Sequence, residues 1–205
     1  MTKHGALILS LLAASAACKN KQAAPSVDID DAHVAAVNAA VPADLKDKIT
    51  FAVGDVKGMG KNDNFKAAVP KGWKAGFMPG SLEPADADNF GSKMLGKTSM
   101  KIGSDCNGTC EKKDWAAVSD KVYFANMTGD KDGKVIKDEK GENRRTVVFE
   151  GKLSDFPEHD VAVRIVTAWW DPEGTRYFVC EVDLGPPVKG AAAAFEKACS
   201  KVSGG

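Results

Sequence analysis

The chain has 205 residues, of which 43% are hydrophobic, 27% charged and 7% aromatic, and its 28 basic residues balance 28 acidic ones. This apolar content and neutral charge exclude an intrinsically disordered chain, and no period in the composition indicates a collagen-like or coiled-coil protein. Without a basic excess, a nucleic-acid partner is not expected, because binding to phosphates needs a basic surface. The length suits one globular domain with short extensions.

The first eighteen residues have the order of an export signal. Lys3 precedes an apolar run over residues 6–17, which is followed directly by Cys18. About twelve helical residues span roughly 18 Å, which is short of the roughly 30 Å hydrocarbon layer of a membrane. The segment therefore predicts a secretion signal rather than a permanent membrane span.

The four residues Ser15, Ala16, Ala17 and Cys18 resemble the lipobox of bacterial lipoproteins, in which a signal peptidase cuts before a cysteine that then receives lipid. Because Ser15 stands where the lipobox pattern prefers Leu, cleavage after Ala17 by the ordinary signal peptidase is the alternative. The resemblance implies that the membrane is a partner through lipid on Cys18, which would give stable anchoring. Lys19 stands where an inner-membrane retention signal usually has Asp, so the resemblance implies the outer membrane of a bacterial cell envelope.

These features divide the chain into a signal peptide at residues 1–17, a lipidated tether at 18–29 and a single domain at 30–205. The domain is expected to begin with a short helix at residues 31–41, because valines recur there at spacings of three and four. Asp30 or Asp31 is a candidate N-cap, and Pro42 would end the helix. His33, on this helix, is interpreted as a solvated side chain rather than a ligand.

Alternating apolar residues next predict a strand at residues 49–53 and another at 65–69. Phe77 and Met78 suggest a partner strand that would complete a hairpin with the second of these. Thr98, Met100 and Ile102 then alternate as a further strand.

The run that ends the second strand, Val-Pro-Lys-Gly-Trp, resembles the PsbP-like or Mog1-like superfamily of small envelope and thylakoid-lumen proteins. The matching residues are Phe65, Val69, Pro70, Gly72 and Trp73. The likeness extends loosely over residues 49–202. It implies an α+β fold in which an antiparallel β-sheet is flanked by helices, and a mostly non-enzymatic role in assembly or as an accessory to larger complexes.

The strand predicted at residues 161–170 is apolar on both faces, so we expect it to lie centrally in the sheet and to be covered on two sides. Trp169 and Trp170 end this strand. Core packing is the favoured interpretation of both rings, because large aromatic side chains more often stabilise a core than recognise a partner. The alternative is that Trp170 presents its ring outward as a partner contact.

Two of the five cysteines fall on the buried faces of consecutive predicted elements. Residues 177–184 alternate so that Cys180 faces the apolar side of a strand, and Cys199 lies on an apolar stripe that runs from Val188 to Val202 at helical spacing. The short turn between the two elements returns the helix across the strand. We therefore predict a Cys180–Cys199 disulfide, which would staple the terminal helix to the sheet.

Cys106 and Cys110 then form the second disulfide by default, across the small loop Cys-Asn-Gly-Thr-Cys. The alternative is a thiol-redox or copper-handling site at these two cysteines. Their spacing has three intervening residues rather than the two of thioredoxin-like motifs, and no histidine follows closely, so the structural disulfide is favoured.

No pattern of a nucleophile elbow, zinc protease helix, phosphate-binding loop or penicillin-binding serine occurs in the sequence. His33 and His159 lie in unlike contexts that indicate no catalytic triad. We therefore expect no catalytic residues, no metal and no cofactor. The sequence favours a non-catalytic, lipid-anchored cell-envelope protein with a binding or accessory role and a protein partner of unknown identity.

Overall fold

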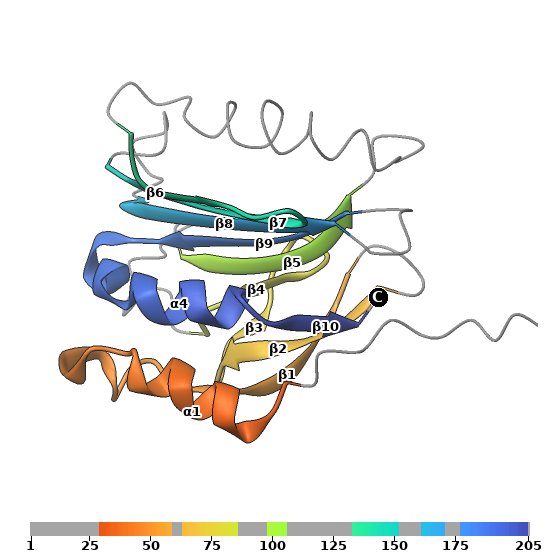
Figure 1. Ribbon diagram of the computed structural model, residues 1–205. Coiled ribbons are helices and arrows are strands. Elements are labelled where there is room, and N and C mark those ends of the chain that lie inside the picture. The colour runs from red at the N-terminus through yellow and green to blue at the C-terminus, as the bar shows by residue number, and fades with distance from the viewer. Residues whose placement is uncertain are drawn as a thin grey trace, which may run out of the picture.

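Two antiparallel sheets and the helices that pack on them make up the described fold (Figure 1). The structure is a computed structural model, and it describes residues 29–58, 63–85, 98–105, 133–151, 161–170 and 177–204. The α+β fold with antiparallel sheets flanked by helices, predicted as a single domain, is confirmed. In place of the one sheet that was expected, however, the strands divide between two.

The smaller sheet joins strands from opposite ends of the sequence. Its order is β1 (Phe51–Lys57), β2 (Asn64–Pro70) and β10 (Val202–Gly204). The larger sheet has seven strands. In spatial order these are β3 (Lys74–Ala75), β4 (Ser81–Glu83), β5 (Ser99–Asp105), β9 (Tyr177–Leu184), β8 (Val163–Trp170), β7 (Arg144–Glu150) and β6 (Lys134–Lys140).

Helix α1 (Asp31–Ala39) starts where the sequence predicted, and it stops two residues earlier than expected. Asp30 is its N-cap, because the Asp30 carboxylate accepts a hydrogen bond of 2.7 Å from the His33 backbone N–H. Short 3-10 turns follow α1 and precede the last helix. They are η1 (Ala43–Leu45) and η4 (Pro186–Ala191), and the last helix is α4 (Ala192–Cys199). Within the described residues, no helix has the length and apolar character needed to cross a membrane.

Helix α4 lies between the two sheets and packs on α1 (Figure 1). Phe195 is its central core residue: its ring meets Phe51 edge to face at a centroid distance of 5.0 Å and lies 5.6 Å from the ring of Trp73. The predicted disulfide between Cys180 and Cys199 is confirmed, with both residues fully buried. It joins the end of α4 to the middle of β9, between β5 and β8.

The outer face of the seven-stranded sheet carries a second buried cluster, opposite α4. Strand β8 lies between β9 and β7, so its predicted central position is confirmed. Its side chains alternate between the two clusters, with Ile165 in the first and Val166 in the second. The outer cluster consists of Val147, Phe149, Val161, Val166, Ala168, Trp170, Tyr177 and Val179.

One strand prediction and one helix prediction were wrong. Phe77 and Met78 do not pair with β2, whose neighbours are β1 and β10; they lie instead in the turn between β3 and β4. Val202, which continues the helical stripe in the sequence, belongs to strand β10, because α4 ends at Cys199. Strand β2 pairs instead with β1, which precedes it in the chain, and with β10 from the far end of the sequence, so both of its edges have partner strands.

Candidate functional site

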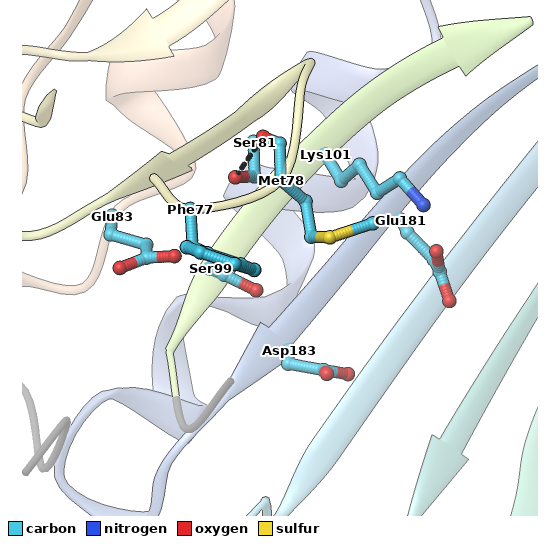
Figure 2. A pocket seen from close by; sticks show the side chains of 8 residues that line it. All are labelled: Phe77, Met78, Ser81, Glu83, Ser99, Lys101, Glu181 and Asp183. Carbon is cyan, nitrogen blue, oxygen red and sulfur yellow. Dashed lines mark hydrogen bonds between the residues drawn. The ribbon is translucent and has the colours of Figure 1, made fainter. Parts of the chain in front are cut away.

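A pocket of about 240 Å³ lies on the outer face of the seven-stranded sheet, under the turn between β3 and β4 (Figure 2). The floor of the pocket is polar because side chains along each strand point alternately into the core and toward the outer face. Met100 and Ile102 point into the core, so Ser99 and Lys101 point outward from β5. By the same alternation, β9 buries Cys180 and presents Glu181 and Asp183 to this face. The lining residues of this cavity, here named the Glu181 pocket, are Phe77, Met78, Ser81, Glu83, Ser99, Lys101, Glu181 and Asp183.

The turn above the pocket is held by backbone hydrogen bonds. The Gly76 N–H donates to the Ser81 carbonyl at 2.9 Å, and the Ile102 N–H donates to the Gly80 carbonyl at 2.9 Å. Gly80 has a φ of +80°, and a Cβ at this position would overlap the carbonyl oxygen of Ile102. Glycine is therefore required for the turn to approach β5 this closely.

This turn presents two large apolar side chains at the rim of the pocket. Phe77 is 77% exposed and Met78 is 50% exposed, and Figure 2 shows both projecting from the turn toward side chains of β5 and β9. The Ser81 hydroxyl donates to the Met78 carbonyl at 2.6 Å, which fixes the turn from inside. An exposed aromatic ring on an ordered turn is a typical contact residue in protein interfaces.

Asp183 on the floor is already paired. It accepts two hydrogen bonds from Arg164 of β8, from Nε at 2.6 Å and from Nη2 at 3.0 Å. This bidentate geometry is the strongest common arrangement of a guanidinium and a carboxylate. The pair fixes the position of the Asp183 carboxylate in the pocket.

Glu181, the other carboxylate that β9 presents to the pocket, differs from Asp183. The strand register places it opposite Lys101 of β5 and Val166 of β8, yet within the described structure its carboxylate makes no hydrogen bond and no ion pair. Burial, together with the negative charge of Asp183, raises the pKa of Glu181 above its ordinary value of 4.5. The floor of the pocket thus holds a half-buried carboxylate that forms no ion pair with any residue the structure describes.

The predicted site residues do not meet at this pocket. Cys18, Cys106 and Cys110 lie outside the described residues, as does His159. Trp170, weighed above as an outward partner contact, is only 3% exposed and packs in the outer cluster, so the favoured core interpretation agrees with its burial. Its neighbour Trp169 is partly buried on the other face and stacks on Phe178 at a centroid distance of 5.5 Å.

His33 is buried, which corrects its interpretation as a solvated side chain. It is 7% exposed and faces α4, and its Nε2 has no hydrogen-bond partner in the described structure. Burial lowers the pKa of His33 below 6.5, and the positive charge of Lys201 acts in the same direction. The short helix α1 packs its first turn onto α4, so a polar position near its start became part of the interface.

Sequence reasoning missed the Glu181 pocket. A signal was present, because an apolar pair followed by Pro79 and Gly80 indicates a turn that exposes large side chains rather than a strand. Among the residues that the structure describes, no three His, Cys, Asp or Glu side chains lie close enough together to hold a metal ion. The pocket combines charged side chains of β5 and β9 with the apolar side chains of Phe77 and Met78.

No family model matches this chain, and no curated protein matches its sequence. Among solved structures, it is similar to the Ran-binding protein Mog1p of Saccharomyces cerevisiae, at 12% identity over 75% of this chain and 95% of that chain, with a TM-score of 0.42. A mutant of protein Mog1 is similar at 12% identity over 74% and 95% of the two chains, with a TM-score of 0.41.

Proposed function

We propose that this protein is a non-catalytic binding protein of a bacterial cell envelope, anchored by lipid on Cys18 and docking a protein partner at the Glu181 pocket. The observation that carries the docking site is the exposure of Phe77, at 77%, on a turn that is held by backbone hydrogen bonds. Leaving a phenylalanine ring in water is unfavourable by roughly 1.5–3 kcal/mol relative to burying it, and a partner would recover this. The lack of catalytic motifs in the sequence supports a role in binding rather than in catalysis.

A photo-crosslinking residue placed at position 77 in cells tests the docking site. We expect a discrete crosslinked adduct at position 77 and the same adduct at position 78. Val53 is the matched control, because it is an apolar residue on β1 with 43% exposure and lies in the other sheet. Equal crosslinking at position 53, or none at positions 77 and 78, would contradict the proposal.

The anchor is tested separately by intact-mass spectrometry of protein extracted from bacterial membranes, with thiols alkylated before and after reduction. A lipid mass increment is expected on the wild-type chain, and Cys18→Ala is expected to release the protein from membranes. Wild-type protein that lacks the increment would remove the anchor but leave the docking site standing. Alkylation of Cys106 and Cys110 before reduction would instead favour the thiol-redox or copper-handling alternative.

A further inference from the structure

The chemistry of the Glu181 pocket is specific enough to indicate what kind of group it receives. Its lining contains three carboxylates, on Glu83, Glu181 and Asp183, against one ammonium, on Lys101. Asp183 is engaged by Arg164, whereas Glu181 has no such partner among the described residues. The pocket is therefore complementary to a positive charge, and among the described residues Glu181 is a carboxylate on its floor with no ion pair.

Lys101 does not supply the counter-charge for Glu181 in the unbound protein. It stands opposite Glu181 in the strand register, but its side chain is exposed and its ammonium lies beyond ion-pair distance of the Glu181 carboxylate. Holding a lysine in a single ion-pair geometry costs side-chain entropy, which in water offsets most of the attraction. A cation delivered by a bound partner, in a pocket from which water is excluded, would interact more strongly with Glu181.

The rim of the pocket is apolar, so a bound group should also have an apolar part. Phe77 and Met78 line the same pocket as Glu181, and Figure 2 shows the Met78 side chain extending toward Glu181. Lysine and arginine carry a long aliphatic stem below a charged head, which matches an apolar rim above an acidic floor. A phenylalanine ring also attracts a cation over its face. The pocket volume of about 240 Å³ leaves room for such a side chain.

We propose that the Glu181 pocket receives one lysine or arginine side chain from a protein partner, with the charged head at Glu181 and the stem against Met78 and Phe77. This inference rests on the proposed binding function and names the chemistry of the partner. A protein is favoured over a free amine because the exposed ring of Phe77 extends beyond the pocket, where only the chain flanking the basic residue would cover it.

Selection of a displayed library of random peptides on the full chain, purified in detergent, tests the inference. Selected peptides are expected to share one basic position, and replacing an arginine there by neutral citrulline should weaken binding about tenfold or more, because the charge-assisted hydrogen bond is lost. Glu181→Gln should cause a similar loss. Glu150→Gln is the matched control, because it removes an exposed carboxylate from β7 of the same sheet.

The outcomes separate this inference from the proposed function. Peptides that need Phe77 but contain no shared basic position would overturn the inference and sustain docking at the turn. Free arginine amide that binds as tightly as the selected peptides would overturn it in favour of a small cation. No selected peptide at all would count against both. Thermal unfolding of Glu181→Gln distinguishes a lost contact from a lost fold.

Discussion

The side chain of Asn38 hydrogen-bonds to both backbone polar groups of Phe51. Its Nδ2 donates to the Phe51 carbonyl at 3.0 Å, and its Oδ1 accepts from the Phe51 N–H at 2.7 Å. The Asn38 amide thus pairs with Phe51 as a neighbouring strand would, at the start of β1. It ties α1 to the smaller sheet at the residue whose ring contacts Phe195.

Asn38→Ala should therefore lower the free energy of unfolding by about 1–3 kcal/mol, because it leaves two half-buried backbone groups without partners. Urea denaturation followed by circular dichroism measures the change. Thr50→Ala is the control, since the Thr50 hydroxyl makes only an exposed hydrogen bond of 3.3 Å to the Lys46 carbonyl. If both variants lose the same free energy of unfolding, the two hydrogen bonds of Asn38 contribute no more than the exposed hydrogen bond of Thr50.

The double variant Cys180→Ala with Cys199→Ala should lower the free energy of unfolding by roughly 3 kcal/mol. The bond closes a loop with a sequence separation of 19 residues, and it restricts the unfolded chain. The measurement is chemical denaturation of the variant beside the wild type with and without reductant. If reduction leaves the wild type as stable as before, this bond does not hold α4 on the sheet.

Gly80→Ala and Gly72→Ala form a matched pair. Both glycines have positive φ, at +80° and +77°, but a Cβ at Gly72 meets nothing within 4 Å, whereas one at Gly80 would overlap the Ile102 carbonyl. Gly72→Ala should lose about 1–2 kcal/mol from backbone strain alone, and Gly80→Ala should lose more. Thermal unfolding measures both. Only Gly80→Ala should also abolish crosslinking at position 77, because the turn must move away from β5.

The stability of the protein should fall as the pH drops below 6.5, through His33. Its pKa is lowered in the folded state by burial and by the charges of Lys201 and Lys197, against the opposing effect of Asp30. The unfolded chain then binds the proton more tightly, so the stabilisation is complete above pH 6.5 and is lost as the pH falls through the folded pKa. The free energy of unfolding, measured by denaturation at several pH values, should fall more steeply below pH 6.5 for wild type than for His33→Leu. If the free energy of unfolding changes with pH in the same way in both proteins, His33 does not cause the pH dependence.

Glu181 should act with the opposite sign. Because its pKa is raised in the folded state, folding favours the protonated form, and its contribution to the free energy of unfolding decreases as the pH rises above 4.5. Glu181→Gln should accordingly unfold at a higher temperature than wild type at pH 7, with the gap closing below pH 4.5. Calorimetry of both proteins at several pH values across this range measures the difference in unfolding temperature. A variant that gains stability while losing peptide binding would show that the carboxylate serves recognition.

The parts of the fold that were predictable are those that short-range periodicity encodes. Alternation alone placed Cys180 on the inner face of β9 and marked β8 as central, and helical spacing placed Cys199 on the same side. With both cysteines facing one core, the disulfide followed. The likeness of the Val-Pro-Lys-Gly-Trp segment contributed the α+β fold class.

The division into two sheets and the Glu181 pocket depend on long-range pairing, which a local pattern does not carry. Val202 continues the helical stripe of α4 in the sequence, but in the structure it pairs with Ala67 of β2. Phe77 and Met78 have the apolar character of strand residues, but they lie in a turn because the backbone at Gly80 hydrogen-bonds to Ile102 of β5. His33 resembles any surface histidine, and only the packing of α1 on α4 buries it.

The position of β10 also has a consequence for how the protein is made. Because β2 borders β10 on one side, the smaller sheet is incomplete until the last described residues have left the ribosome. Contacts between such distant segments form slowly, since loop closure must precede them. The smaller sheet is therefore completed only after the segments that form the larger sheet have been synthesised.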